Sequence, residues 1–293
     1  MSMIINKFAK QATLKNLVLL MVGLFITAIF IWYCNLTPSN NRDWQTDVAV
    51  LPEATINGKL VTIHNIRNFD YRTELDYIPA YYDKQFALNK LRGVDLVATY
   101  WMGPAIAHIF LSFDFGDNDH VAISIEARKE KGEAYSTLKG FFRQYELYYV
   151  VADERDLIRL RTNYRRDPPE QVYVYRTHSA LNSDKKLFLE YIKKINALKL
   201  KPEFYNSLTT NCTNNIWQHN RVNADNLSYS WQILASGYLP KYVYDAGRLD
   251  TSVPFSKLEQ ISHVNARAQA ADKSQAFSLL IRTTTYEIQH PSK

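Results

Sequence analysis

Residues 107–128 read AHIFLSFDFGDNDHVAISIEAR and predict two strands joined by a tight turn. Apolar and aromatic residues fill 107–115, whereas 120–128 alternates as a strand with one polar face does. The four residues between them, Gly116-Asp-Asn-Asp119, are typical of a turn. The stretch is therefore a β-hairpin in the sequence-based interpretation.

The hairpin sets one histidine against one acid. If it turns about Asp117, opposite residues have numbers that sum to 234, and His108 faces Glu126. A carboxylate opposite an imidazole fixes the ring tautomer and stabilises the imidazolium. The alternative is that Glu126 is a surface acid paired with Arg128, and a register slip of one residue would separate Glu126 from His108.

The chain around the hairpin predicts a mixed α+β fold. Further strands are expected over 60–64, 94–101, 144–152 and 171–176, and helices over 153–164 and 184–198. The second helix is amphipathic, and Asp184 is its expected N-cap. Strands and helices are only partly interleaved, which favours α+β over a doubly wound parallel sheet.

Residues 17–34 read LVLLMVGLFITAIFIWYC and predict a transmembrane helix. Eighteen residues without a charge extend about 27 Å as a helix, close to the thickness of a hydrocarbon core. Lys7, Lys10 and Lys15 precede the run, and the next cation is Arg42. The positive-inside rule then places the N-terminus in the cytoplasm and the bulk of the chain outside.

A cleaved signal peptide is the rival interpretation of this run. No small-residue cleavage site follows it, and Trp32 and Tyr33 are too bulky for lipoprotein attachment at Cys34. We therefore expect an uncleaved single-pass anchor. With Cys34 in the bilayer, Cys212 has no partner within the chain, and is either buried and inert or kept free for chemistry.

Composition excludes several classes of protein. The net charge is +6, but the first fifteen residues hold three of the cations and no acid, which leaves 32 basic against 29 acidic side chains elsewhere. This balance argues against a nucleic-acid partner. Two cysteines exclude a disulfide scaffold and a Cys-rich zinc module. Dinucleotide, P-loop and zinc-protease motifs are absent, and no two histidines have metal-ligand spacing on a predicted helix, so neither a cofactor nor a metal is expected.

Residues 208–218 read LTTNCTNNIWQ and predict a helix that begins at Cys212. Thr210 and Asn211 are good N-cap residues, and Ile216 and Trp217 supply an apolar face. A thiol in the first turn of a helix has a lowered pKa because the backbone dipole stabilises its thiolate. A buried structural cysteine is the alternative, against which the polar neighbours argue.

A cysteine nucleophile needs a base, and the chain has seven histidines. His108 is favoured because it starts a strand after the Gly103-Pro104 break, where a side chain can reach a cleft. His120 is interpreted as a polar residue beside the turn. His219 follows Cys212 by two helical turns, too far along the axis.

At these residues the sequence resembles a known family. The stretches AHIFLSFDF, AISIEARKEKGE, YELYYVVADERD and FYNSLTTNCTNNIW are similar to the periplasmic domain of the bacterial Lnb-type lipoprotein N-acyltransferases, first catalogued as a domain of unknown function. The resemblance runs from about residue 43 to 282. It implies a permuted papain-like thiol fold in which Cys212 and His108 are the catalytic pair. Full-length relatives carry further membrane helices after this domain, whereas one span is expected here, which puts the substrate in question.

The resemblance and the residues together give one set of expectations. The segments are a cytoplasmic N-terminus (1–16), the anchor (17–34), a linker and N-terminal extension (35–93), a catalytic domain (94–285) and a tail (286–293). The expected protein is an inner-membrane, periplasm-facing cysteine acyltransferase with Cys212 as nucleophile, His108 as base and Glu126 as its orienting acid. Its expected substrates are a phospholipid acyl donor and a lipoprotein acceptor. The alternatives are a cysteine peptidase or amidase that acts on cell-wall peptides, and a non-catalytic binding protein of the same fold.

Overall fold

The computed structural model describes residues 2–282, with side chains from Lys15 onward. The chain divides into two compact units between Ser39 and Asn40. The expected tail over 286–293 lies outside the described residues.

The first unit is one apolar helix, α1 (Ser2–Asn35). Its segment Lys15–Asn35 is long and apolar enough to cross a membrane, and its side chains are largely exposed. An apolar helix therefore stands where the sequence predicts a span, over 17–34.

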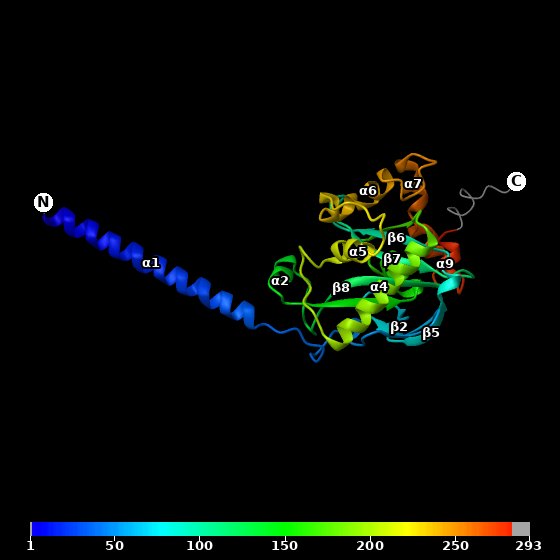
Figure 1. Cartoon of the computed structure of the whole chain (residues 1–293), viewed down its shortest axis with the longest axis horizontal. Coiled ribbons are helices and arrows are strands. Elements are labelled where there is room, and N and C mark those ends of the chain that lie inside the picture. Colours follow the sequence, from blue (N-terminus) through cyan, green and yellow to red (C-terminus); the bar gives the residue numbers. More distant parts are fainter. Residues whose placement is uncertain (1, 283–293) are drawn as a thin grey trace. The chain divides into compact units, whose positions relative to one another are not determined.

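The second unit is built on a curved, mostly antiparallel sheet (Figure 1). Its order is β1-β2-β9-β8-β7-β6-β10, with β5 also paired to β2, and β2 and β9 meet in parallel at Arg67 and Ala152. The strands are β1 (Glu53–Asn57), β2 (Leu60–Arg67), β5 (Tyr81–Ala87), β6 (Gly93–Tyr100), β7 (His108–Asp114), β8 (His120–Arg128), β9 (Glu146–Ala152) and β10 (Gln171–Arg176), and a separate ribbon pairs β3 (Asp70–Tyr71) with β4 (Tyr77–Ile78).

Helices cover both faces of this sheet. One face carries α4 (Leu181–Leu200) and α5 (Cys212–Asn220), as Figure 1 shows, with α6 (Leu239–Asp245) and α7 (Phe255–Ser262) beside them. The other face carries α3 (Glu154–Arg159), its π-helical continuation η3 (Leu160–Tyr164), α8 (Asn265–Ala270) and α9 (Phe277–Leu280). The remaining elements are α2 (Thr137–Phe141) and the short turns η1 (Thr46–Val48), η2 (Leu88–Lys90), η4 (Trp231–Ile233) and η5 (Ser236–Tyr238). The fold class is α+β, as predicted.

The strand sequences explain why both faces are covered. Along β8, Val121, Ile123 and Ile125 belong to the core under α4 and α5, whereas Ala122 belongs to the core under α3 and α8. Side chains alternate between faces along a strand, so a strand that is apolar at odd and even positions must be buried on both sides.

The predicted hairpin register is confirmed. The ladder pairs Leu111 with Ile123 and Asp114 with His120, and each pair of numbers sums to 234. The turn contains Gly116 at φ +83°, a conformation that glycine adopts without steric cost. Beyond Leu111 and Ile123 the ladder stops, so His108 and Glu126 are not ladder partners.

One helix prediction needs correction. Asp184 does not cap α4: the helix begins at Leu181, and Asp184 lies buried in the first turn, where it accepts a hydrogen bond from Ser179. The charged segment 153–164 is helical, as predicted. Its acids Glu154 and Asp156 are buried because arginines from other parts of the chain neutralise them.

The expected boundary near residue 93 falls between β5 and β6 of one sheet. The strands over 53–87 add to the sheet formed by the rest, and the folded unit begins at Asn40.

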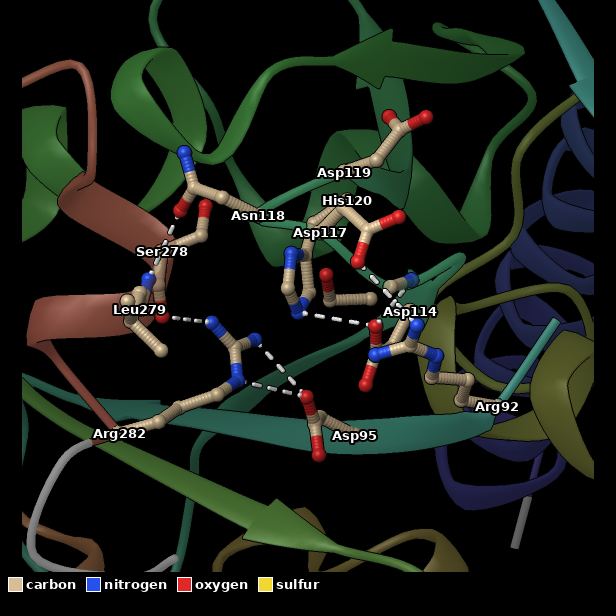
Figure 2. Close-up of polar contacts among 12 residues, drawn as sticks. Arg92, Asp95, Asp114, Asp117, Asn118, Asp119, His120, Ser278, Leu279 and Arg282 are labelled. Carbon is tan, nitrogen blue, oxygen red and sulfur yellow. Dashed lines mark hydrogen bonds and ion pairs between the residues drawn. The ribbon is translucent and has the colours of Figure 1, made fainter. Parts of the chain in front are cut away.

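Figure 2 shows the turn end of the hairpin, where charged side chains meet within the fold. The Arg282 Nε atom donates to Asp95 at 2.9 Å, and its Nη1 atom donates to Glu154 at 2.7 Å. The His120 Nε2 atom lies 3.5 Å from Asp114 Oδ1. Burial and the Arg282 cation lower the pKa of His120, so its ring is held neutral. At about 3.3 Å per residue, this end of β7 is about 20 Å from His108.

Candidate active site

The nucleophile candidate sits where the sequence predicts it. Cys212 is the first residue of α5, and Asn211 is the N-cap, with extended backbone angles and a side-chain oxygen that accepts the Asn214 N–H at 2.8 Å. Ile216 and Trp217 pack against the sheet core and hold the helix in place. The half-buried thiol therefore lies at the positive end of the helix dipole.

The polar residues that follow Cys212 do not mark an exposed site, although the sequence analysis used their polarity as an argument against a buried cysteine. Thr213, Asn214 and Asn215 are buried. Asn214 Nδ2 donates to the Leu208 carbonyl at 2.7 Å, and Asn215 Nδ2 donates to the Asn211 carbonyl at 3.0 Å. These side chains fasten the loop before α5, and so their polarity does not itself mark an exposed site.

The structure brings His108, Glu126 and Cys212 together. The His108 Nε2 atom lies 3.1 Å from Glu126 Oε1, and the imidazole and the Cys212 thiol are close enough to shift each other's pKa. The Ile109 N–H also lowers the pKa of that thiol. The predicted contact between His108 and Glu126 is present although their strands have separated at this point.

Ser124, which the sequence analysis did not single out, completes the contact. Its hydroxyl donates to Glu126 Oε1 at 2.6 Å, so its oxygen accepts from His108 Nε2–H at 2.7 Å. The proton is thereby placed on Nε2, and Nδ1 is the nitrogen left for the thiol. Ser124 lies two residues before Glu126 on the same face of β8, which was the only signal in the sequence that could have pointed to it.

Charges at the site favour a thiolate–imidazolium pair. Burial by itself lowers the pKa of His108, but the Glu126 carboxylate and the hydrogen bonds with Cys212 and Glu126 outweigh it and raise the pKa to about 9. Burial raises the pKa of the Cys212 thiol, but His108 and the Ile109 N–H reverse this and leave it below its usual value. Both shifts favour proton transfer from sulfur to nitrogen.

A buried arginine keeps Glu126 ionised. Arg161, on η3, places its Nη2 atom 3.2 Å from Glu126 Oε1, and only 4% of its side chain is exposed. Burial raises the pKa of Glu126, but His108 and Arg161 hold it well below its usual value. Glu170 lies on the other side of Arg161, with Oε2 3.7 Å from its Nε atom, and binds Arg165 at 2.7 Å. No sequence pattern connects η3 to the hairpin, and so Arg161 was missed.

The two other histidines considered as a base, His120 and His219, lie apart from this group. His120 is at the far end of the hairpin. His219, near the end of α5, is bonded to the Tyr149 hydroxyl at 2.6 Å, and burial with the nearby Lys194 cation lowers its pKa to about 4. Within residues 2–282, no cluster of three or more His, Cys, Asp or Glu side chains is placed to hold a metal ion.

The three residues line an open cavity of about 810 Å³. Its lining includes the apolar and aromatic residues Trp101, Met102, Ile106, Tyr135, Tyr205 and Leu234, and the charged residues Lys129, Arg161, Arg165 and Asp167. The half-buried thiol thus faces a cleft wide enough for a substrate that has both an apolar and a polar part.

A comparison with known protein families covers the part of the chain that holds these three residues. The sequence pattern of the Lnb N-terminal periplasmic domain matches residues 77–237, a range that includes His108, Glu126 and Cys212. No curated protein and no solved structure matches the chain. The family match covers more than half of the chain, and the chain therefore belongs to the family of Lnb N-terminal periplasmic domains.

Proposed function

We propose that the protein is a membrane-anchored periplasmic cysteine acyltransferase. It transfers a fatty acyl group from a phospholipid to the N-terminus of a lipoprotein, through a thioester on Cys212. The observation that carries the proposal is that Cys212, His108 and Glu126 line one cavity, with Glu126 3.1 Å from the imidazole. A histidine on a strand that precedes a cysteine at a helix start also fits a permuted papain-like fold.

The first half-reaction forms the thioester. The Cys212 thiolate attacks the ester carbonyl of the phospholipid, and the carbonyl oxygen becomes an oxyanion. The N–H groups of Cys212 and Thr213 lie in the first turn of α5 without an acceptor inside the helix, and are suited to bind that oxyanion. When the C–O bond breaks, the His108 imidazolium gives its proton to the departing lysophospholipid oxygen.

The second half-reaction reverses the proton movements. The amine at the N-terminus of the lipoprotein attacks the thioester carbonyl, and neutral His108 accepts the proton that the nitrogen loses. Collapse of the intermediate breaks the C–S bond, forms the amide and regenerates the thiolate. Glu126 stabilises the imidazolium in both halves because it stays ionised beside Arg161.

The expected location of the chain at the periplasmic face of the inner membrane supports a phospholipid and a lipoprotein as substrates. The chain belongs to a periplasmic domain family, and its N-terminal apolar helix fits a single-pass inner-membrane protein. We propose that this helix is retained as an anchor, which would confine the enzyme to the surface where phospholipids and lipoproteins are found.

A second candidate is a cysteine peptidase or amidase that acts on cell-wall peptides. It is favoured by the charged side chains that line the cleft, which include Arg165 and Asp167 and suit a polar ligand. The same nucleophile and base would serve, with water as the second acceptor.

Product analysis separates the candidates. The full chain, reconstituted with phospholipid, is incubated with a diacylated lipopeptide or with a cell-wall peptide, and products are identified by mass spectrometry. Acyltransfer predicts one added acyl chain on the lipopeptide amine, absent with Cys212→Ala. Cleavage of the cell-wall peptide without acylation would support the hydrolase, and no product from either would favour a binding protein.

A further inference from the structure

One rim of the cleft is an uncharged apolar surface. It is made from residues 96–107 and 226–240, and neither segment contains a charged residue. We call their exposed side chains the first rim, which comprises Met102, Ile106, Tyr229, Trp231, Leu234 and Tyr238. Met102 is 70% exposed and Trp231 is 60% exposed.

The two segments are held together by hydrogen bonds. The Gly237 N–H donates to the Ala105 carbonyl at 3.0 Å, and the Ala107 N–H donates to Ser236 Oγ at 3.0 Å. A Cβ atom at position 237 would lie 2.0 Å from the Pro104 carbonyl oxygen, so the close approach requires glycine. The first rim is therefore fixed in place by the fold and is not a loose loop.

Apolar side chains are also exposed around α2, beside two cations, of which Lys139 pairs with Glu133 at 3.4 Å. In residues 134–145, Lys139 and Arg143 are the only charged residues. We call the exposed side chains of this side the second rim, which comprises Tyr135, Leu138, Phe141, Phe142 and Leu208. The Ser207 hydroxyl donates to the Thr137 carbonyl at 3.0 Å, which ties α2 to the loop that leads to Cys212.

The linker that follows α1, residues 36–39, is the tether, and it joins the folded unit beside the end of β8. Asn40 is the first residue of this unit, and the Arg128 guanidinium donates to the Asn40 side-chain oxygen at 3.2 Å. Gln45 N–H donates to the carbonyl of Lys129, which lines the cleft. Only four residues, 36–39, separate α1 from Asn40, so the reach is at most about 18 Å.

We propose that the first and second rims dock into the outer surface of the phospholipid bilayer, with the mouth of the cleft between them facing the lipid. Exposed apolar and aromatic side chains beside the cations Lys139 and Arg143 suit the interface between headgroups and acyl chains. A tether that joins the domain beside the cleft keeps both rims within reach of the membrane. The inference rests on the proposed function for what enters the cleft, but docking itself needs no turnover.

The test uses the full chain in nanodiscs of phosphatidylethanolamine and phosphatidylglycerol. In a Cys34→Ser, Cys212→Ala background, single cysteines replace Leu138, Trp231 or Leu279 and carry a fluorescent probe. Leu279 is the matched control because it is 57% exposed, and its N–H is bonded to Asn118 at the turn end of the hairpin.

Docking predicts that nitroxide-labelled phospholipids quench the probes at 138 and 231 at least twofold more than the probe at 279. Equal quenching at all three positions would overturn it. Protection of 138 and 231 from an aqueous quencher without quenching by the labelled lipid would also overturn it, because a protein would then cover the rims. Acylation of wild-type Cys212 is measured separately: docking without acylation contradicts the proposed function alone, and acylation without docking contradicts this inference alone.

Discussion

The Nε2 atom of His108 lies 3.1 Å from the Oε1 atom of Glu126, at the point where their two strands have stopped pairing. The contact is thus made by side chains beyond the end of the ladder, and Ser124 bridges it. It matters because the carboxylate raises the pKa of the imidazole that faces the thiol.

Glu126→Gln is expected to lower turnover by one to three powers of ten and to move the basic limb of the pH profile. The pKa of His108 is raised to about 9, so the protonated ring is available at neutral pH and is lost as the pH rises through about 9. Without the carboxylate the pKa falls, because burial then dominates. The limb of kcat/KM should move to lower pH by one unit or more. Glu130→Gln, an exposed acid just beyond β8, is the control and should leave the limb in place; an unmoved limb in Glu126→Gln would contradict the assigned role.

Cys212 is expected to ionise at a lower pH than an ordinary thiol. Its pKa is lowered, so the rate of alkylation in a Cys34→Ser background should rise with a midpoint below the usual value of about 8.5. His108→Ala should raise that midpoint, since burial alone raises the thiol pKa. A midpoint above the usual value in the parent protein is the contrary result.

Arg161→Met is expected to move the acidic limb of the pH profile of turnover to higher pH. Arg161 helps to depress the pKa of Glu126, whose support of His108 is present above that pKa and lost as the pH falls through it. Without the arginine the pKa of Glu126 rises, so this support should be lost at a higher pH.

The control for Arg161→Met is Arg159→Met, which removes a buried arginine that contacts the carbonyls of Phe69 and Asp272. Both variants should lose on the order of 2–3 kcal/mol of unfolding free energy, measured by urea denaturation. Only Arg161→Met should move the acidic limb, and an equal shift in both would assign Arg161 a purely structural role.

His120→Ala is expected to affect stability and not chemistry. Its side chain is only 6% exposed and lies at the opposite end of the hairpin from His108. Truncation should lower the free energy of unfolding by about 1–3 kcal/mol and leave kcat/KM within a few-fold of the parent value. Loss of activity in a folded His120→Ala protein would require another assignment of the site.

The anchor is expected to remain attached, with the folded unit in the periplasm. Protease added to spheroplasts should digest the domain without lysis, and the mature chain should retain residues 17–34 by mass. Resistance until lysis would reverse the topology, and a mature N-terminus after residue 34 would make the segment a signal peptide.

The hairpin was predictable because its information is local. Strand alternation and a four-residue turn fix the register, and the register is what pointed from His108 to Glu126. Cys212 at the start of α5 was predictable for the same reason, since Asn211 caps the helix from the neighbouring position.

The remainder of the site depends on distant segments. Arg161 reaches Glu126 only because η3 packs over Phe110, and a charged stretch in sequence gives no sign that its arginines are buried. The two apolar rims were missed because the sequence of residues 96–107, 134–145 and 226–240 does not distinguish exposed apolar side chains from core residues. Their exposure depends on how the ends of the strands are arranged around the cleft.

The central claim is that Cys212 carries an acyl group during turnover. Intact mass spectrometry of the purified full chain, incubated with phospholipid and no acceptor, tests it most directly. We expect the mass of one fatty acyl chain on the peptide that contains Cys212, removable by hydroxylamine and absent from Cys212→Ala and His108→Ala. An unmodified Cys212 in a folded protein, under conditions where phospholipid is bound, would contradict the account.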